Sequence, residues 1–463
     1  MAIIEAGTHR FDGLRDRMRG AVIPADDPRY DEARLAWAMA HEQHPAAVVY
    51  PLDANDVVEI VNFARSAGLQ VTAQGTGHNS GAHGDRLSDS ILVKTSEMRE
   101  VSVDAGAQIA RAAAGALWMD VVPVAAEHGL AALVGSSPDV GVIGYSLGGG
   151  VGYLGRKHGI ATNSVTAIEL VTADGRFRRV DADNDPDLFW ALRGGGGNFG
   201  LVTAMEFRVY PAEELYAGMM LWPVEDAARV FKVWRDWTET APDEVTSMAR
   251  MIQFPPLPDV PEPLQGRHMM VLSAAFVGSA EDGAEVLQPL RDLGPEMDMF
   301  GPMPIEGLMR LHGDPEEPMA FSSDHAVIDA LPDEAIDEIV AQAGAGTGSP
   351  LLMVELRQMG GAMGRAPEGA GALDRVDGKF LAFTGGLHMA PGDPDRVAGA
   401  ARDVMAALAP YSRGRTYLNF AERVTNTRSA YSVETHQRLQ AVKARYDSEG
   451  LLHGNHRIEA AAS

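Results

Sequence analysis

The sequence predicts an α+β fold in two parts, and three observations lead to this prediction. Residues 46–211 alternate short β-rich runs with amphipathic stretches, a pattern typical of an α+β or α/β domain. After residue 211 the chain becomes rich in Met, Ala and Leu, and strand-like runs alternate with helical ones. The length of 463 residues also exceeds that of one ordinary domain. We therefore expect two domains with a boundary near residue 211.

The first part is expected to contain short strands and capped helices. Asp53 opens a helix that Gly68 stops, and Gly129 ends another. A third helix opens at Asp185 and Pro186, because proline lacks an N–H that the first helical turn would leave unpaired. The predicted helices are 53–67, 118–127 and one from 185, and the predicted strands are 47–50, 69–73, 91–94, 167–172, 177–180 and 201–209.

The second part is expected to form an antiparallel sheet with helices on one face. Its predicted strands are 216–222, 244–253, 268–276, 351–356 and 379–388. Its predicted helices are 224–239, 280–293 and 333–343. Two glycine-rich segments, 344–350 and 360–371, are expected to be loops.

Composition excludes several functional classes. The formal charge of −25 is spread along the chain, which argues against binding to nucleic acid or to an anionic membrane surface. The first twenty residues lack a signal-peptide core and no apolar run is long enough to span a bilayer, so we expect a cytoplasmic protein without a membrane partner. The absence of cysteine excludes disulfides, thiolate nucleophiles and cysteine-bound metals. Unusual chemistry would therefore require a bound cofactor.

A glycine-rich loop, AQGTGHNSGAHG, covers residues 73–84. Gly75 and Gly77 can adopt positive φ, which allows consecutive N–H groups to converge on a pyrophosphate. His78 follows directly. Taken alone, it is interpreted either as a solvated loop histidine or, with His83 and Asp85, as a metal ligand; no second ligand cluster completes such a site, and we predict no metal.

A second glycine-dense stretch, SSPDVGVIGYSLGGGVGYLG, covers residues 136–155. It contains the pattern GxGxxG, with Glu169 about twenty residues later, as in a Rossmann dinucleotide site. That fingerprint requires a strand directly before it, whereas proline and glycines interrupt residues 138–148. A nicotinamide-binding Rossmann fold is therefore the weaker alternative.

The two loops, the segments 170–175 (LVTADG) and 187–203 (DLFWALRGGGGNFGLVT), and the tail from 417 to 458 resemble the flavin-dependent oxidases of the vanillyl-alcohol oxidase and berberine-bridge-enzyme family. Thr76 replaces the first glycine of that family's GGH motif. The resemblance implies a PCMH-type FAD-binding domain in two pieces around a substrate domain. We expect an FAD-binding domain at 1–211, with its PCMH-type part at about 43–211, a substrate domain at 212–410, and a C-terminal return at 411–463.

The resemblance implies a covalent bond from His78 to the 8α-methyl group of FAD. Many relatives add a bond from a cysteine in the second loop, and the matching residue here is Ser137, which cannot form a thioether. The chain thus looks like a singly tethered member, of the kind that includes 6-hydroxy-D-nicotine oxidase. Ser137 would either hydrogen-bond the flavin or cap Asp139 in a turn.

The predicted flavin contacts lie in five segments. The segment 193–200 (RGGGGNFG) is either a flexible turn or, as the resemblance implies, a loop beside the flavin. The predicted contacts are Gln74, Gly75, Thr76, Gly77, His78, Asn79, Ser80, His83, Ser137, Pro138, Gly141, Gly144, Gly148, Gly149, Gly150, Gly200, Val202, Tyr417, Asn419 and Asn455.

Tyr417 is the first candidate catalytic residue, in the segment YLNF that resembles the family's YxNY. An alternating strand would put Tyr417 and Asn419 on one face. In relatives a tyrosine here removes a proton from the substrate, which requires that its pKa of about 10 be lowered. The alternative is a half-buried strand tyrosine; Phe420 departs from the motif, and His456 could lie on the surface.

Three further candidates belong to the substrate cavity. Glu355 and Arg357, two residues apart on a predicted strand, either point into one cavity or form a salt bridge on a solvated face. Tyr145 is a candidate for the cavity wall.

The expected function is FAD-dependent oxidation of an alcohol or amine carbon in a small molecule. A hydride would pass to flavin N5, and O2 would reoxidise the flavin to give H2O2. The alternatives are a secondary-metabolite tailoring enzyme that couples oxidation to cyclisation, a Rossmann-type NAD(P) dehydrogenase, and a flavin-free binding module. A monomer or homodimer is expected.

Overall fold

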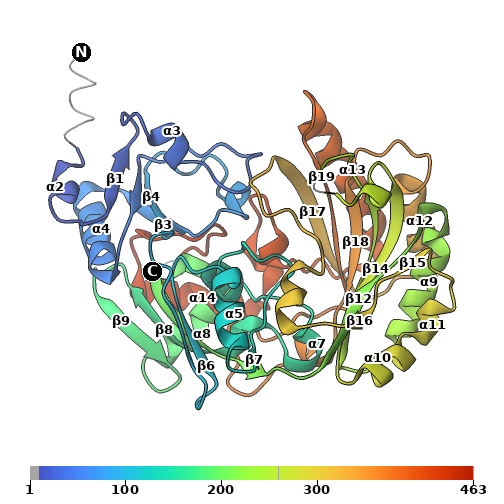
Figure 1. The fold of residues 1–463 in the computed structure, drawn as a ribbon. Helices are drawn as coiled ribbons and strands as arrows, with labels where there is room; N and C mark the ends of the chain where they lie inside the picture. The colour runs from blue at the N-terminus through green and yellow to red at the C-terminus, as the bar shows by residue number, and fades with distance from the viewer. Residues whose placement is uncertain (1–9, 259, 462–463) are drawn as a thin grey trace.

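The computed structural model describes residues 10–258 and 260–461 (Figure 1). Residues 1–9, which belong to the N-terminal segment considered above for a targeting signal, lie outside the described residues. Two smaller sheets occupy one half of the molecule and a large sheet occupies the other. This mixture of helices with parallel and antiparallel sheets confirms the predicted α+β class.

The first small sheet has the order β1-β2-β4-β3, in which only β1 is antiparallel to its neighbour. Its strands are β1 (Ala21–Pro24), β2 (Ala47–Tyr50), β3 (Gln70–Gln74) and β4 (Ser90–Lys94). Helix α4 (Ala54–Ala67) joins β2 to β3. The Asp53 side chain accepts two backbone N–H bonds at its start, and Gly68, at φ 66°, ends it. Strand β3 therefore delivers the chain to the glycine loop after Gln74.

The second small sheet is antiparallel, in the order β5-β6-β10-β8-β9. Its strands are β5 (Val101–Asp104), β6 (Ile109–Ala113), β8 (Val165–Val171), β9 (Phe177–Asp181) and β10 (Leu201–Arg208). Helices α5 (Trp118–Ala126), α6 (Val142–Leu147) and α8 (Pro186–Gly195) share its core. Helix α6 directly precedes the glycines of the GxGxxG pattern. The strand that a Rossmann site needs at this point is replaced by a helix, so that alternative is wrong.

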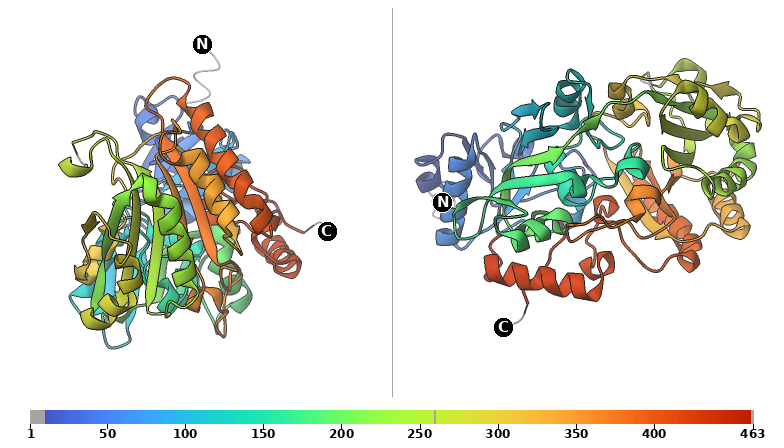
Figure 2. Two further views of the ribbon diagram at one scale, coloured as in Figure 1. Left: turned by 90° about the vertical axis from the view of Figure 1, so that its right-hand side faces the viewer. Right: turned by 90° about the horizontal axis from the view of Figure 1, so that it is seen from below.

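The large sheet is antiparallel throughout, in the order β15-β12-β14-β13-β18-β19-β17, with β16 beside β12. Its strands are β12 (Leu215–Pro223), β13 (Val245–Gln253), β14 (His268–Val277), β15 (Met297–Asp298), β16 (Gly301–Pro302), β17 (Phe321–Ile328), β18 (Met353–Gln358) and β19 (Phe380–Leu387). Helices α9 (Ala227–Thr238), α10 (Ala280–Val286), α11 (Gln288–Arg291), α12 (Asp333–Ala343) and α13 (Asp393–Leu408) lie on its outer face (Figures 1 and 2).

Helices cover one face of the large sheet and leave the other face uncovered by helices. Trp222, Trp234 and Phe380 are buried between the sheet and its helices in the largest apolar core of the described chain. The opposite face is turned toward the two small sheets (Figure 1). Side chains on that inner face are therefore the ones available to a site between the two halves.

The C-terminal segment returns to the first half of the molecule (Figure 2). Helix α14 (Val433–Tyr446) contacts α8, and Leu452 forms an isolated parallel bridge with Val71 of β3. Lys443, which is buried, donates from Nζ to Asp447 Oδ2 at 2.6 Å and to the backbone oxygen of Asn198 at 2.7 Å. The return thus ties the last fifty residues to the loops of the small sheets.

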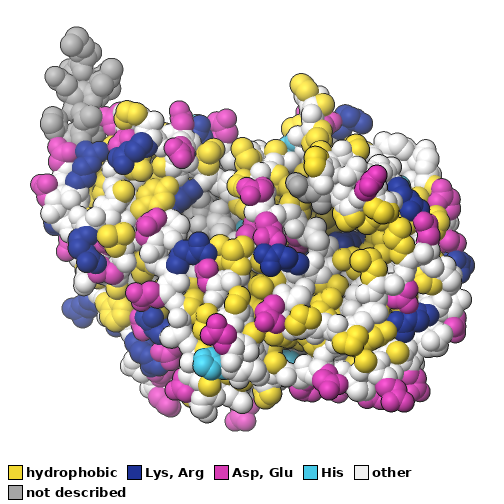
Figure 3. All heavy atoms as spheres, in the orientation of Figure 1, with side chains coloured by type: hydrophobic (Ala, Val, Ile, Leu, Met, Phe, Trp, Pro, Cys, Tyr) yellow, Lys and Arg dark blue, Asp and Glu magenta, His cyan; other side chains and the backbone are white. Residues whose placement is uncertain are grey.

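The face seen in Figure 3 carries acidic and basic side chains interspersed with apolar ones. No helix in the described ranges is long and apolar enough to cross a membrane.

The tail depends on one amide, and its removal tests the fold. Asn198, 2% exposed, donates to the oxygens of Gly195 and His456 and accepts the N–H groups of Gly454 and Ile458. Asn198→Ala leaves these backbone groups buried without partners, so we expect a loss of about 3 kcal/mol of unfolding free energy. Urea denaturation measures this loss.

A control substitution separates this effect from a general loss at the protein surface. Asn184→Ala, at an exposed turn, should change the unfolding free energy by less than about 0.5 kcal/mol. Equal denaturation midpoints for the two variants would contradict the anchoring role.

Candidate functional site

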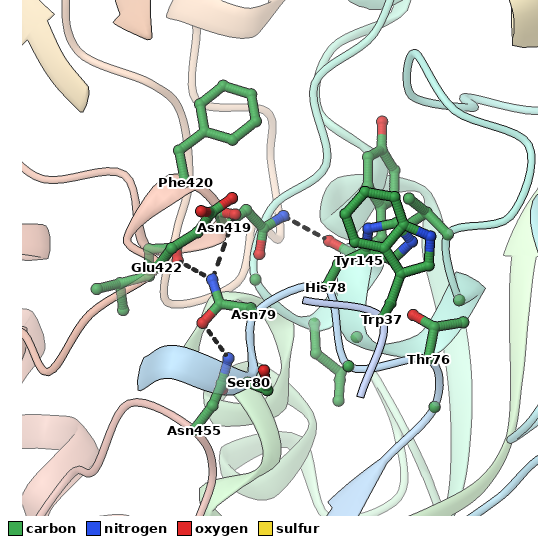
Figure 4. A pocket seen from close by; sticks show the side chains of 18 of the residues that line it. Trp37, Thr76, His78, Asn79, Ser80, Tyr145, Asn419, Phe420, Glu422 and Asn455 are labelled. Atoms are coloured by element: carbon green, nitrogen blue, oxygen red, sulfur yellow. Dashed lines mark hydrogen bonds between the residues drawn. The ribbon is translucent and has the colours of Figure 1, made fainter. Parts of the chain in front are cut away.

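A cavity of about 380 Å³ lies between the inner face of the large sheet and the small-sheet half. This volume is typical of a small-molecule site. Its wall combines the loop after β3, residues 135–148, the glycine run 194–197, the large sheet and the C-terminal return. Figure 4 shows side chains of the loop after β3, Tyr145 and side chains of the C-terminal return around one space.

Most of the predicted site residues meet in this cavity, and a few do not. The wall includes Gln74, Gly75, Thr76, Gly77, His78, Asn79, Ser80, His83, Ser137, Gly141, Gly144, Tyr145, Gly148, Gly200, Val202, Arg357, Tyr417, Asn419 and Asn455. Pro138, Gly149, Gly150 and Glu355 do not line it.

One set of glycines leaves room for a ligand. Gly75, Gly141 and Gly144 line the cavity, and a Cβ added at any of them would meet no atom within 4 Å. None of the three has a positive φ. Neither packing nor backbone strain therefore requires glycine at these positions, and the omitted side chains leave space in the cavity itself.

A second set of glycines leaves room for side chains of the C-terminal segment. A Cβ at Gly148 would lie 1.8 Å from Asn419 Oδ1, and one at Gly149 would lie 2.9 Å from the Tyr417 hydroxyl. The Gly150 N–H donates to the Tyr417 hydroxyl at 2.8 Å. We therefore correct the prediction for Gly149 and Gly150. These two glycines lie outside the cavity lining, where their lack of a side chain allows the C-terminal segment to approach.

His78 is held between an aromatic ring and a carboxylate. Trp37 stacks on its ring with centroids 4.1 Å apart, and His78 Nε2 lies 3.4 Å from Asp139 Oδ2. The Ser137 hydroxyl donates to Asp139 Oδ1 at 2.7 Å, as the turn interpretation of Ser137 expects. Burial raises the pKa of Asp139, but its contacts with His78 outweigh this and hold the pKa below its usual value. An ionised Asp139 thus orients the imidazole.

Neither Trp37 nor Asp139 was predicted as a site residue. Asp139 stands two positions after Ser137, so its place in the second loop was a usable signal. Trp37 gave none, because it lies outside both glycine loops. Its backbone N–H donates to the Thr76 oxygen at 3.0 Å, which brings the N-terminal segment against the first loop.

Tyr417 and Asn419 reach the cavity on a turn. The prediction of an alternating strand is wrong here, because Leu418–Phe420 form a single 3-10 turn in which the Phe420 N–H donates to the Tyr417 oxygen at 3.0 Å. The Asn419 amide donates to the Tyr145 backbone oxygen at 2.9 Å and to the Tyr417 hydroxyl at 3.4 Å. The turn therefore brings both side chains to one point.

The protein keeps Tyr417 neutral. Burial raises the pKa of its hydroxyl above the usual value, although hydrogen bonds from Gly150 and Asn419 lower it. Both of these partners donate to the phenol oxygen. The lowered pKa that a phenolate base needs is therefore not supplied by the protein groups alone.

Glu355 and Arg357 form a buried pair, and only Arg357 reaches the cavity. Glu355 Oε1 accepts from Arg357 Nε, and Glu355 Oε2 faces His312 Nε2. His312 Nδ1 lies 2.6 Å from Asp314 Oδ1. The interpretation as a salt bridge on a solvated face is wrong, because both members are buried. His312 and Asp314 were not predicted, since their loop carries no motif.

The tail supplies further polar groups to the wall. Asn455 donates to Asn79 Oδ1 at 3.0 Å (Figure 4). His456 is buried and lies 3.0 Å from the Leu418 oxygen through Nε2, so its interpretation as a surface residue is wrong. Burial raises the pKa of Glu422, another unpredicted wall residue, to about 7. In the described part of the chain, no cluster of histidines and carboxylates is arranged to hold a metal ion.

Comparison with known proteins identifies the cofactor. Residues 45–181 match the family model of an FAD-binding domain. The features that fit such a group are the space beside Gly75, Gly141 and Gly144 and the buried His83 Nδ1 and Tyr145 hydroxyl, which have no hydrogen-bond partner among the described residues. A dinucleotide needs both open backbone and unpaired polar atoms, and the wall offers both.

The chain is also similar to whole proteins. It is 29% identical to (R)-6-hydroxynicotine oxidase of Paenarthrobacter nicotinovorans over 96% of this chain and 98% of that protein. The crystal structure of 6-hydroxy-D-nicotine oxidase from Arthrobacter nicotinovorans superposes with a TM-score of 0.82 at 28% identity, covering 96% of this chain and 98% of that one. A variant of berberine-bridge-enzyme-like protein 1 from Physcomitrella patens shares the fold, with a TM-score of 0.85 at 20% identity, covering 98% and 100%. The chain therefore matches an FAD-binding domain at residues 45–181 and is similar along its whole length to FAD-linked oxidases.

Proposed function

We propose that this protein is an oxidase that carries FAD bonded to His78 alone and oxidises an alcohol or amine carbon of a small organic molecule. The observation that carries the proposal is His78, oriented by Asp139 on the wall of a glycine-lined cavity. When bound, the flavin accepts a hydride at N5 and passes two electrons to O2, which gives H2O2. The similarity to (R)-6-hydroxynicotine oxidase along the whole chain supports an oxidase.

The surroundings of His78 favour attachment to the flavin. With a proton on Nε2 directed at Asp139, the other ring nitrogen keeps its lone pair and can act as a nucleophile. A bond from that nitrogen would replace one hydrogen of the 8α-methyl group, and the two protons and two electrons lost would leave with O2 as H2O2. Ser137 provides no sulfur and the sequence contains no cysteine, so the proposal has a single tether.

Tyr417 is the proposed group that moves the substrate proton. Its oxygen accepts hydrogen bonds from Gly150 and Asn419, so its own O–H is left to point elsewhere, toward a substrate oxygen or nitrogen. To act as a base, the phenol must first lose this proton. Asn419 and Gly150 stabilise the anion when it forms.

His78→Ala tests the attachment. The variant should retain the fold and bind FAD reversibly, because the rest of the cavity wall is intact, but acid precipitation should release all flavin to the supernatant. Visible absorbance and fluorescence of the washed pellet measure this. An acid-stable flavin in the variant would contradict the proposed bond, and wild-type protein without flavin would contradict the proposed function as a whole.

Asp139→Asn tests the orienting carboxylate. The amide keeps the shape but removes the charge, so we expect apoprotein mixed with FAD to form the covalent bond about tenfold more slowly or worse. The fraction of acid-stable flavin against time gives the rate. Asp85→Asn, in an exposed position after the first loop, is the matched control and should keep the wild-type rate.

Tyr417→Phe tests the proton transfer. Flavin reduction, followed by stopped-flow absorbance with a substrate found by peroxide release, should slow by about 10²-fold. Because burial raises the pKa of Tyr417, the phenolate is scarce at neutral pH. The wild-type rate should therefore rise roughly tenfold per pH unit at least up to pH of about 10, and the variant should lose this rise. Equal rates and equal pH profiles would remove Tyr417 from the mechanism.

A further inference from the structure

Five charged or titratable side chains form a cluster at the end of the cavity that the large sheet closes. Arg250 on β13 and Glu355 on β18 are cross-strand partners, and Arg357 follows on the same face of β18. His312 and Asp314, from the loop before β17, lie over them. Arg250, His312, Glu355 and Arg357 are buried, and His312, Asp314 and Arg357 line the cavity.

Hydrogen bonds and ion pairs join the members of this cluster. Each ring nitrogen of His312 faces a carboxylate oxygen, Nδ1 that of Asp314 at 2.6 Å and Nε2 that of Glu355. Arg250 Nη1 also lies 2.9 Å from both ring nitrogens, and Arg250 Nη2 donates to the His312 backbone oxygen. Arg250 is thus occupied by His312, and Arg357 is the arginine of the cluster that lines the cavity.

The carboxylates of the cluster are held in their ionised form. Burial raises the pKa of Glu355, but the neighbouring Arg357 and His312 charges overcome this and hold the pKa well below its usual range. Burial likewise raises the pKa of Asp314, and the His312 charge lowers it further than burial raises it. Both acids therefore stay ionised near neutral pH.

Arg357 presents its guanidinium to the cavity. Its Nε donates to Glu355, whereas its two terminal nitrogens have no hydrogen-bond partner among the residues that the structure describes. The guanidinium lies over the Phe420 ring, 4.9 Å from the ring centroid. It is thus held on one side by Glu355 and on one face by an aromatic ring, with two N–H groups left for a ligand.

Apolar side chains surround this guanidinium along the cavity wall. They are Phe321, Met353, Phe383 and Phe420. A hydrogen-bonding ligand group here is shielded from water, so its interaction with Arg357 is stronger than at a surface. This end of the cavity thus combines the Arg357 guanidinium, beside His312 and Asp314, with apolar side chains.

We propose that the substrate carries a carboxylate that pairs with the terminal nitrogens of Arg357 while its apolar body lies against the aromatic side chains. This inference rests on the proposed function, since it names the class of substrate for the same site. The fork of a guanidinium matches the two oxygens of a carboxylate. A carboxylate also offers the Arg357 guanidinium an opposite charge, which a neutral alcohol or amine does not.

The experiment compares two ligands of similar size on the purified protein with its flavin. Benzoate and benzyl alcohol differ chiefly in charge, and both fit beside aromatic side chains. Isothermal titration calorimetry, with the flavin absorbance change as a second readout, should give at least tenfold tighter binding for benzoate. Equal affinities of the two would overturn the inference.

Variants locate the binding. Arg357→Met should weaken benzoate binding at least tenfold and leave benzyl alcohol within about twofold; Arg357→Lys keeps the charge without the fork and should give an intermediate loss. The Lys variant also keeps a positively charged partner for Glu355, so it provides the test if the Met variant does not fold. Arg365→Met, at an exposed arginine eight residues further on, is the matched control. The assignment to Arg357 would be overturned if the Lys variant, and the Met variant where it folds, both bound benzoate with wild-type affinity.

Two outcomes remain separable. Protein that contains no flavin but binds benzoate through Arg357 contradicts the proposed function and supports the carboxylate subsite. Flavoprotein that binds benzoate no better than benzyl alcohol retains the proposed function and contradicts the subsite. Inorganic phosphate serves as an additional probe, and tighter binding of phosphate than of benzoate would overturn the choice of a carboxylate.

Discussion

The close approach of the C-terminal segment to the glycine run 148–150 is the constraint on which the rest of the site depends. Asn419 occupies the space that a side chain at position 148 would fill, and its amide reaches the Tyr145 oxygen. Tyr417 meets the backbone N–H of Gly150 in the same way. The segment can take this position only because Asn198 and Lys443 hold the tail that follows it. The cavity is therefore closed by residues far apart in sequence, and its shape is a tertiary property.

Electrostatics divides the cavity into two ends. At one end Asp139 faces His78, and at the other Arg357 presents its guanidinium beside Glu355. The protein as a whole has a formal charge of −25, but salt screens that field over about 10 Å, so the buried cluster controls the local potential. Tyr417 and Glu422 lie on the same wall without ionised partners, and burial raises the pKa of both. Proton transfer and charge recognition thus use different groups.

The sequence predicted the elements that are determined locally. Helix α4 was predicted from Asp53 and Gly68, and five strands of the large sheet were predicted from their apolar runs, within two residues at either end. Strand β17, FSSDHAVI, was not predicted because of its polar residues. These residues have partners outside the strand that the sequence does not reveal; Arg423, for example, donates to Asp324. The segment around residues 418–420 was predicted as a strand from its alternating pattern. It forms a turn because the tertiary contacts of Asn419 override that pattern.

The same dependence on tertiary contacts explains which site residues could be predicted from the sequence and which could not. The glycine loops and His78 were found because each is a continuous motif, whereas Trp37, His312 and Glu422 act through contacts with residues remote in sequence. Glycine itself is ambiguous in a sequence: Gly141 leaves space in the cavity, while Gly148 leaves space for Asn419. Only the atoms around each position separate these two uses.

The arrangement also separates the parts of the chain that hold the cofactor from those that select the substrate. The open glycines and His78 belong to loops of the small-sheet half, whereas Arg250, Glu355 and Arg357 stand on central strands of the large sheet. A central strand is fixed by neighbours on both sides, so a guanidinium there is held more rigidly than on a loop. Changes on β13 and β18 can alter the charge offered to a substrate while the loops around His78 remain the same. The proposed carboxylate site thus lies on the inner face of the large sheet.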